Sequence, residues 1–371
     1  MKNFWKEVNT RTQKEGKPFF ALAPMADVTD PAFRRILAKY GKPDVTWTEF
    51  VSADGLAHPV GREKLMKDLA FTEAERPIVA QLFSSNPENM KNAAKLCVEL
   101  GFDGVDINMG CPDRTIEKQG CGSAMIKTPD KAIEVIRAAK AGILEAVAEA
   151  APQGKTISEI PLSVKTRVGY NKEIIDEWIP VLLNENIAAL TIHARTRKDL
   201  SKVHANWDYV KRVVALRDKI APDTIIIGNG DVADVADGLE KARATRCDGI
   251  MIGRACFGNP WIFNQDVKVL KRGTWNQGWW LNMLPRNWAK KIMGDSRYTT
   301  ADVSIEDKLT VMIEHSELFC KLLPHKNFAT MKKHYKAYCH GFPGAKELRI
   351  SLMESPDIET VKQLVHDFLK K

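Results

Sequence analysis

Residues 106–127, DINMGCPDRTIEKQGCGSAMIK, contain the side chain with the clearest capacity for chemistry. The first apolar run of this segment ends at Asn108, and the Gly110-Cys111-Pro112 turn then presents a thiol on a loop. A cysteine can act as a nucleophile, a metal ligand, a disulfide partner or an acid. The segment has no histidine to activate a nucleophile, and its two cysteines lack metal-ligand spacing. An acid role for Cys111 is attractive, although a lone cysteine is more often an inert buried residue.

Lys165 is a second candidate, because it follows the apolar residues LSV and would project from a buried strand. A buried cation is costly unless it faces an anion. A reduced flavin carries negative charge at one edge of its ring and would supply such an anion. His193 and Arg195 follow another apolar run in the same way. A lone histidine is more often structural, but its position among cations favours a binding site.

Two glycine-containing segments, GNGDV at 228–232 and GIMIGRACFGNPWIF at 249–263, suit a phosphate group. Glycines let backbone N–H groups approach an anion closely, and a nearby arginine adds charge. Gly230, Gly253 and Arg254 are therefore candidates for binding a cofactor phosphate. Two tight turns without a ligand explain each segment equally well on its own. Their occurrence after two successive strands favours the ligand.

Short β-rich runs recur along the chain, and a helical pattern follows each, which is typical of a parallel sheet built from βα units. The helical patterns include residues 87–100, 128–143 and 173–186, with Pro87 and Thr128 as starts. Eight such alternations predict a TIM barrel. The eight expected strands are FFALAPM (19–25), VTWTEF (45–50), PIVAQLF (77–83), GVDINMG (104–110), LSVKTRVG (162–169), ALTIHAR (189–195), IIIGNGD (225–231) and GIMIGRA (249–255).

Polar and reactive side chains lie near the carboxyl ends of these expected strands. In a TIM barrel those ends meet at one face, where the βα loops form the active site. Each residue alone could be structural, but eight at the same end favour a shared site. They are Met25, Glu49, Gln81, Asn108, Lys165, His193, Asn229 and Arg254.

The length and composition fit one barrel with a small appendix. The chain has 371 residues, 44% hydrophobic and 27% charged, which are ordinary values for a globular protein. Seven cysteines without a framework spacing predict reduced thiols rather than disulfides. The sequence has no CxxC pair or Cys/His cluster, so we expect no metal site. It has no run of about 18 apolar residues and no secretory signal, so we expect a cytoplasmic protein that does not enter a membrane.

The pattern changes after the barrel. Residues 1–272 are predicted to form the catalytic barrel, and the Trp-rich residues 273–304 a long connection. Residues 305–371 read as a small all-helical domain. Ser304 followed by Asp307 predicts a capped helix start. A second helix, TMKKHYKAYCHG, is expected to end at Gly341.

One segment of the helical domain is strongly basic. Residues 321–350 contain seven lysines and arginines against one acid, Glu347, a net charge of +6 within a chain of net charge +8. Lys332, Lys333 and Lys336, with His334 and Tyr335 between them, could present phosphate contacts and a stacking ring to RNA. A solvated basic helix face is the alternative.

Taken together, the motifs resemble those of the dihydrouridine synthase family, in particular its bacterial B-like members. The resemblance runs from about Phe19 to the C-terminus. It implies FMN as the prosthetic group, NADPH as the electron donor and tRNA as the substrate. The motifs that carry it are ALAPMADVTDPAFRRI (21–36), QLFSSNP (81–87), DINMGCP (106–112), VKTRVG (164–169), HARTR (193–197), GNGDV (228–232), MIGRA (251–255) and GFPGAKELR (341–349).

The same resemblance implies roles for individual residues. Cys111 corresponds to the proton donor to C5 of uracil, while the flavin gives a hydride to C6, and Asn108 helps to orient the base. Arg195 is also expected at the substrate, and Lys332, Lys333, Lys336 and Arg349 on the tRNA backbone. Flavin contacts are expected at Pro24, Met25, Ala26, Gln81, Lys165, His193, Asn229, Gly230, Asp231, Gly253 and Arg254.

Three features depart from the family pattern: an additional cysteine at Cys121, a lengthened segment at 144–160 and the long connection at 273–304. Cys121 is expected to be a packed loop residue rather than a second reactive thiol. Two other functions remain open, a flavin reductase of small molecules and an RNA-binding protein on an inactive barrel. We expect a monomer, and the modified uridine position stays undetermined.

Overall fold

The computed structural model describes residues 3–154, 157–264 and 303–370. The chain divides into two compact units, residues 1–38 with 43–255 and residues 39–42 with 256–371. The domain boundaries predicted from the sequence stay a prediction, and most of the connection expected at 273–304 lies outside the described residues.

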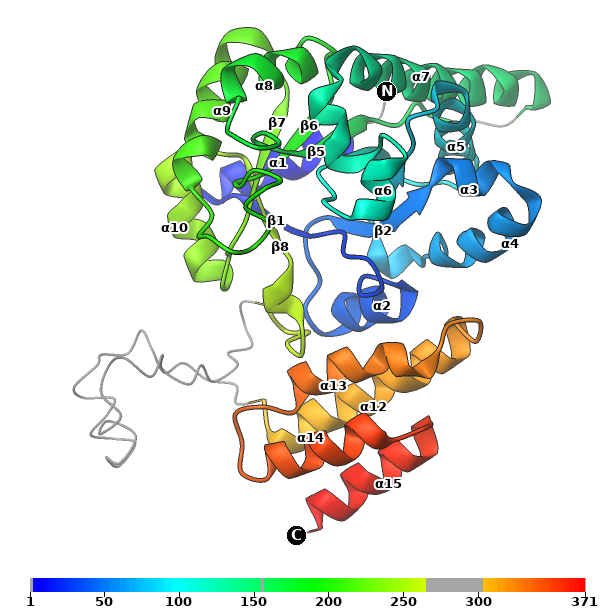
Figure 1. Ribbon diagram of the computed structural model, residues 1–371, viewed down its shortest axis with the longest axis vertical. Coiled ribbons are helices and arrows are strands. Elements are labelled where there is room, and N and C mark those ends of the chain that lie inside the picture. The colour runs from blue at the N-terminus through cyan, green and yellow to red at the C-terminus, as the bar shows by residue number, and fades with distance from the viewer. Residues whose placement is uncertain (1–2, 155–156, 265–302, 371) are drawn as a thin grey trace. The chain divides into compact units, whose positions relative to one another are not determined.

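The first unit is a parallel barrel in which helices follow strands (Figure 1). Neighbouring strands pair in the order β1-β8-β7-β6-β5-β4-β3-β2, all parallel. A backbone hydrogen bond from the Leu22 N–H to the Val45 carbonyl (3.0 Å) connects β1 to the segment before β2 and closes the barrel. The strands are β1 (Phe19–Leu22), β2 (Thr46–Ser52), β3 (Ile78–Phe83), β4 (Gly104–Met109), β5 (Leu162–Arg167), β6 (Ala189–His193), β7 (Ile225–Asn229) and β8 (Gly249–Ile252).

The predicted TIM barrel is confirmed, and the strands end one to three residues earlier than expected at all but the second and third strands. The helices of this unit cover the outside of the sheet or occupy its loops. They are α1 (Phe4–Lys14), α2 (Pro31–Tyr40), α3 (Ala53–Ala57), α4 (Pro59–Asp68), η1 (Glu73–Glu75), α5 (Pro87–Glu99), α6 (Arg114–Lys118), η2 (Gly122–Lys127), α7 (Pro129–Ala150), η3 (Ala151–Gln153), α8 (Ile175–Leu183), α9 (Trp207–Ile220), α10 (Val235–Thr245) and η4 (Arg254–Cys256). The ends of α2 and η4 cross the division between the units.

The N-terminal end of the barrel is closed by apolar side chains. Trp5 of α1 is fully buried, and its ring lies 5.9 Å from that of Phe19 and 5.4 Å from that of Trp47. Both partners come from the first two residues of their strands, so α1 packs beneath the barrel. A site at the other end, where the strands finish, is therefore open only on the side of the βα loops.

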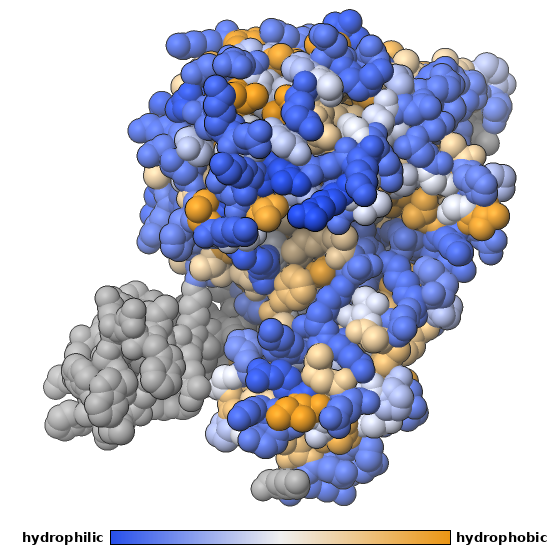
Figure 2. All heavy atoms as spheres, in the orientation of Figure 1, coloured by the Kyte–Doolittle hydropathy of each residue, from blue (hydrophilic) through white to orange (hydrophobic). Residues whose placement is uncertain are grey.

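The second unit is helical, as predicted, with α12 (Ile305–Leu322), η7 (Phe328–Met331), α13 (Lys332–Tyr338), α14 (Ala345–Glu354) and α15 (Ile358–Leu369). The capping box expected at Ser304 and Asp307 is present, with the Asp307 N–H 2.9 Å from the Ser304 hydroxyl. The prediction that Gly341 ends the second helix is wrong, because α13 already stops at Tyr338. Hydrophilic side chains cover most of the face of each unit seen in Figure 2.

Candidate functional site

Cys111 lies on the loop after β4, two residues beyond the end of the strand, as the sequence predicted. The side-chain oxygen of Asn108 accepts hydrogen bonds from the backbone N–H groups of Gly110 (3.1 Å) and Cys111 (2.9 Å). The Cys111 carbonyl in turn accepts from the Ser123 hydroxyl (2.8 Å) and the Ser123 N–H (3.0 Å). The peptide groups of Cys111 are therefore held on both sides, which fixes the start of the thiol side chain.

The Cys111 thiol favours its protonated form. The residue is half-buried, and burial raises its pKa above the ordinary value, while the backbone of Asp113 and the charge of Arg167 oppose that shift. A thiol with a raised pKa carries its proton throughout the neutral range, as an acid must. Cys121 is fully buried, which confirms that it is a packed loop residue.

Lys165 and Arg167 bring positive charge to the same mouth. Both belong to β5, and their even spacing puts them on one face of the strand. Lys165 is paired in register with Asn108 of β4, so the cation and the Cys111 loop start from adjacent strand positions. Burial, reinforced by the charge of Arg167, lowers the pKa of Lys165 to about 8. At neutral pH the ammonium form still predominates.

Arg167 did not feature in the sequence prediction, yet its position makes it part of the site. Its side chain is 5% exposed and donates from Nε to the Gly110 carbonyl at 2.8 Å and from Nη1 to the Thr196 carbonyl at 3.0 Å. Burial lowers its pKa to about 10, so it is charged at neutral pH. Its spacing of two from Lys165 was the signal that could have revealed it.

His193 closes β6 next to Arg167, its partner in register, and is surrounded by cations. Arg195 Nη1 lies 3.2 Å from His193 Nε2, and since an arginine only donates, Nε2 is the acceptor and the neutral ring carries its hydrogen on Nδ1. Burial lowers the pKa of His193 well below its ordinary value, and four cations reinforce the shift. They are Arg167, Lys165, Arg195 and Arg254.

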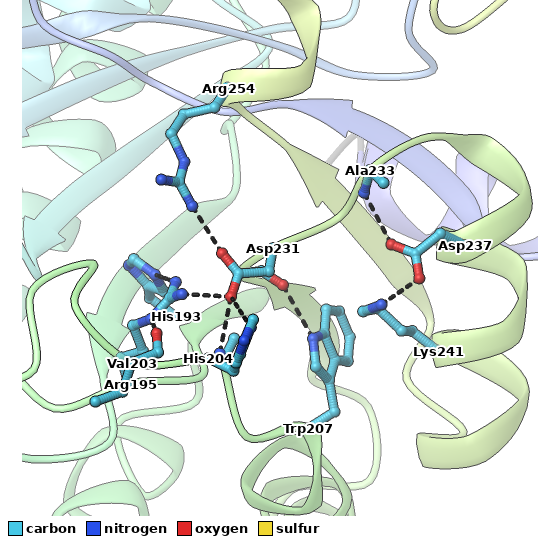
Figure 3. A network of polar contacts seen from close by, with 12 residues as sticks. His193, Arg195, Val203, His204, Trp207, Asp231, Ala233, Asp237, Lys241 and Arg254 are labelled. Atoms are coloured by element: carbon cyan, nitrogen blue, oxygen red, sulfur yellow. Dashed lines mark hydrogen bonds and ion pairs between the residues drawn. The ribbon is translucent and has the colours of Figure 1, made fainter. Parts of the chain in front are cut away.

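Asp231 connects the loops after β6 and β7 (Figure 3). Its carboxylate accepts hydrogen bonds from Arg195, from Arg254 Nη2 (2.7 Å) and from the Ala205 N–H (2.9 Å). The net effect of these partners lowers the pKa of Asp231, although burial opposes them. Because a carboxylate repels a phosphate, this geometry suits Asp231 to orienting the two arginines rather than to touching an anion itself.

Arg195 is 3% exposed and also donates to the Val203 carbonyl at 2.8 Å, so several of its donors are committed within the protein. Arg254 differs, because 66% of its side chain is exposed at the mouth. Gly230 has a φ of +129°, and a Cβ there would lie 2.8 Å from the Ala205 Cβ. The tight approach of the two loops thus requires glycine at this position.

The turn after β1 carries three of the predicted contacts, Pro24, Met25 and Ala26. Pro24 and Met25 are half-buried and Ala26 is exposed. Thr29 fixes the turn, since its hydroxyl accepts from the Met25 N–H at 3.0 Å. The turn therefore presents its backbone at the barrel mouth in a defined conformation.

Below the Cys111 loop, three buried side chains are linked by hydrogen bonds. Gln81 donates from Nε2 to Asp106 Oδ2 at 2.7 Å, and Asn108 donates from Nδ2 to Gln81 Oε1 at 3.0 Å. Burial raises the pKa of Asp106 to about 6. The sequence prediction included Gln81 and Asn108 but not Asp106, whose signal was a carboxylate inside an apolar strand.

The donor set of the mouth suits a phosphorylated, flat cofactor. Four cations, Lys165, Arg167, Arg195 and Arg254, surround the neutral His193, and they outnumber the carboxylates of Asp106 and Asp231. Such an excess of positive charge is costly without an anionic ligand. Among the described residues no group of three or more His, Cys, Asp and Glu side chains is arranged to hold a metal ion.

The basic residues predicted to contact RNA lie in the helical unit. Lys332 and Lys333 are half-buried and Lys336 is exposed on α13, and Arg349 is half-buried on α14. The expected stacking role of Tyr335 and His334 is wrong, because both are fully buried, and the Tyr335 hydroxyl lies 3.1 Å from that of Ser316. Residues that point into a helical core cannot stack on a base. In the part of the chain that is described, no helix has the length and apolarity to span a membrane.

Known proteins similar to this chain identify its family. A family profile described as dihydrouridine synthase matches residues 21–371. A Bacillus subtilis (strain 168) protein described as a probable tRNA-dihydrouridine synthase 2 is 37% identical over 374 residues, covering 100% of this chain and 97% of that protein. A Staphylococcus aureus (strain COL) protein described as a probable tRNA-dihydrouridine synthase is 36% identical, and the match covers 99% of this chain and 95% of that protein.

A solved structure of morphinone reductase is similar over 66% of this chain and 84% of its own, with 13% identity and a TM-score of 0.44, too distant to indicate a shared activity. The family profile and the bacterial relatives, in contrast, extend along nearly the whole sequence. The chain therefore belongs to the dihydrouridine synthase family.

Proposed function

We propose that this protein reduces the C5=C6 bond of uridine in tRNA, with FMN as its prosthetic group and NADPH as the electron donor. The observation that carries the proposal is the pairing of Asn108 with Lys165, which brings the Cys111 loop and a buried cation to adjacent strand ends. Family membership and the descriptions of the bacterial relatives as probable tRNA-dihydrouridine synthases support tRNA as the substrate.

Bound FMN, once reduced, supplies the hydride that C6 of the uracil accepts. Cys111 then gives its proton to C5, for which its raised pKa keeps the thiol protonated at neutral pH. Lys165 stabilises negative charge at the cofactor, and Gly253 with Arg254 bind its phosphate. A stacked uridine cannot reach the end of a barrel, so the base must leave the RNA stack before reaction.

The remaining contacts predicted from the sequence have the same interpretation. Pro24, Met25, Ala26, His193, Asn229 and Gly230 line the cofactor. Gln81, which is fully buried, acts beneath the site through Asn108 rather than by touching the cofactor as predicted. Asp231 acts through the arginines that it orients, and Asn108 and Arg195 adjoin the substrate. Lys332, Lys333, Lys336 and Arg349 bind the tRNA backbone, where lysine and arginine contribute chiefly through phosphate charge.

A reconstitution experiment tests this function. The purified protein should show flavin absorbance, and with NADPH it should form dihydrouridine in unmodified tRNA, detected by mass spectrometry of the nucleosides. Free uridine monophosphate in place of tRNA distinguishes the two enzymatic hypotheses. Efficient reduction of the mononucleotide without tRNA turnover would favour a small-molecule reductase, and a colourless protein that binds tRNA would favour an RNA-binding protein.

A further inference from the structure

A line of buried amide and carboxylate groups runs from the barrel interior to the Cys111 backbone. Asp106 and Gln81 are fully buried, and Asn108 is 6% exposed. Gln81 and Asp106 are register partners on β3 and β4, and Asn108 is two residues further along the same face of β4. These three side chains therefore form a continuous path to the loop that carries the thiol.

The direction of each hydrogen bond in this path is fixed from both ends. At the loop, the N–H groups of Gly110 and Cys111 can only donate, so Asn108 must offer them its oxygen. Its amide nitrogen then faces Gln81 Oε1 at 3.0 Å, which leaves the nitrogen of Gln81 for Asp106 at 2.7 Å. A buried carboxylate is the acceptor that this last donor requires.

Loss of the acceptor at Asp106 removes the constraint on both amides. A buried Gln81 nitrogen without a partner is destabilising, which favours rotation of the amide. The rotated amide would place the Gln81 nitrogen against the Asn108 nitrogen, and two donors repel each other. Asn108 would then give up the Cys111 N–H. The hydrogen bonds from Ser123 to the Cys111 carbonyl and from Arg167 to the Gly110 carbonyl would remain, so the loop would lose only the contact with Asn108.

We propose that Asp106 and Gln81 are positioning residues that hold the Cys111 thiol in its reactive place through the amide of Asn108. This inference rests on the proposed function, in which Cys111 is the acid. It assigns a functional reason to a buried carboxylate that touches neither the cofactor nor the substrate.

Asp106 could also act through its charge, since it stabilises the ammonium of Lys165. Asp106→Leu removes both the acceptor and the charge. Asp106→Asn removes the charge but keeps an oxygen that accepts from Gln81. The new amide nitrogen can donate to the Ser163 hydroxyl, which can itself donate to the Val105 carbonyl, 3.3 Å away. Ser163→Ala removes the other hydrogen bond to Asp106, of 2.6 Å, and leaves the path to Cys111 intact.

The test combines turnover with the alkylation rate of Cys111 by iodoacetamide in the full-length protein, followed by peptide mass spectrometry across a pH series. Cys320 is the other half-buried cysteine of the described residues and provides an internal control. In Asp106→Leu we expect kcat to fall on the order of 10- to 100-fold. We expect Cys111 alkylation at neutral pH to rise about threefold with a lower pH midpoint, because a looser loop is better solvated.

Asp106→Asn and Ser163→Ala should retain the Cys111 alkylation profile of the parent. Ser163→Ala should also retain its turnover, whereas Asp106→Asn lowers turnover through the lost charge beside Lys165. If Asp106→Leu does not fold, Gln81→Met, which removes both amide contacts at similar length, should show the same faster alkylation. An unchanged alkylation profile in Asp106→Leu or Gln81→Met would overturn the proposal, as would equal Cys111 alkylation rates in Asp106→Asn and Asp106→Leu. Failure of the parent to form dihydrouridine would instead refute the proposed function, since alkylation does not depend on turnover.

Discussion

Lys165 donates a hydrogen bond from Nζ to Oδ1 of Asn229 at 3.3 Å, across the barrel mouth from β5 to β7. Asn229 is oriented in turn by the bond from its Nδ2 to the Met251 carbonyl at 2.9 Å. The amide oxygen therefore faces the lysine, and the ammonium group is held inside the barrel mouth rather than in solvent. A fixed, poorly solvated cation acts strongly on a neighbouring anionic ring.

Replacing Lys165 by Met should slow flavin reduction by NADPH on the order of tenfold or more, because the anionic reduced cofactor loses its counter-charge. In the parent, burial lowers the pKa of Lys165 to about 8, so the ammonium form and the rate should decline as the pH rises through this value. Stopped-flow measurement of flavin bleaching at several pH values gives both quantities.

Lys165→Arg serves as the matched control, because a guanidinium keeps its charge throughout this pH range. Its reduction rate should lack the decline near pH 8, even if the absolute rate differs. Equal pH profiles for the parent, the Met variant and the Arg variant would rule out Lys165 as the titrating cation.

Gly230 and Gly253 provide a comparison of stability within one site. Gly230→Ala should lower the free energy of unfolding by about 1–3 kcal/mol, because φ is +129° and the new Cβ would lie 2.8 Å from that of Ala205. Gly253→Ala should change it by less than about 1 kcal/mol, since its new Cβ meets only ordinary contacts of 3.4 Å. Urea unfolding of both flavin-free variants measures the two changes in the free energy of unfolding. Equal losses of stability in Gly230→Ala and Gly253→Ala would contradict this prediction.

The basic face of α13 should contribute to tRNA affinity through charge. Replacing Lys332, Lys333 and Lys336 together by Ala should weaken binding at low salt and reduce the slope of log Kd against log salt by about one for each phosphate that is no longer neutralised. Titration of labelled tRNA at several salt concentrations tests this. Lys362→Ala is the control, because its ammonium is already paired with Glu317 (2.9 Å) and Glu359 (3.1 Å). An unchanged salt slope in the triple variant would place the RNA-binding surface elsewhere.

The barrel could be predicted from the sequence because its strands are short apolar runs separated by helical patterns. The site could be located for the same reason, since polar side chains at strand ends such as Asn108, His193 and Asn229 meet at one mouth. The ends of the strands were predicted less accurately. The chain continues past the last hydrogen bond of the sheet without a clear stop signal, so residues such as Gly110 were included in a predicted strand.

Hydrogen bonds between residues far apart in the chain could not be predicted from the sequence. The sequence marks Arg167 and Asp106 as unusual strand residues. Their hydrogen-bond partners, Gly110 and Gln81, come from other segments and are known only from the structure. Tyr335 shows the converse error, because an aromatic residue between lysines suggests an exposed stacking group. Helical periodicity instead turns it into the core against Ser316.

Cys111→Ala tests the central claim, that this thiol is the acid in uridine reduction. The variant should keep its flavin and its reduction by NADPH, while dihydrouridine formation in tRNA falls by at least about 100-fold. Cys121→Ala, which alters a fully buried cysteine of the same segment, should retain activity. The decisive measurement is the dihydrouridine content of tRNA after reaction with each flavin-loaded variant: a product level in Cys111→Ala equal to that of the parent would contradict the account.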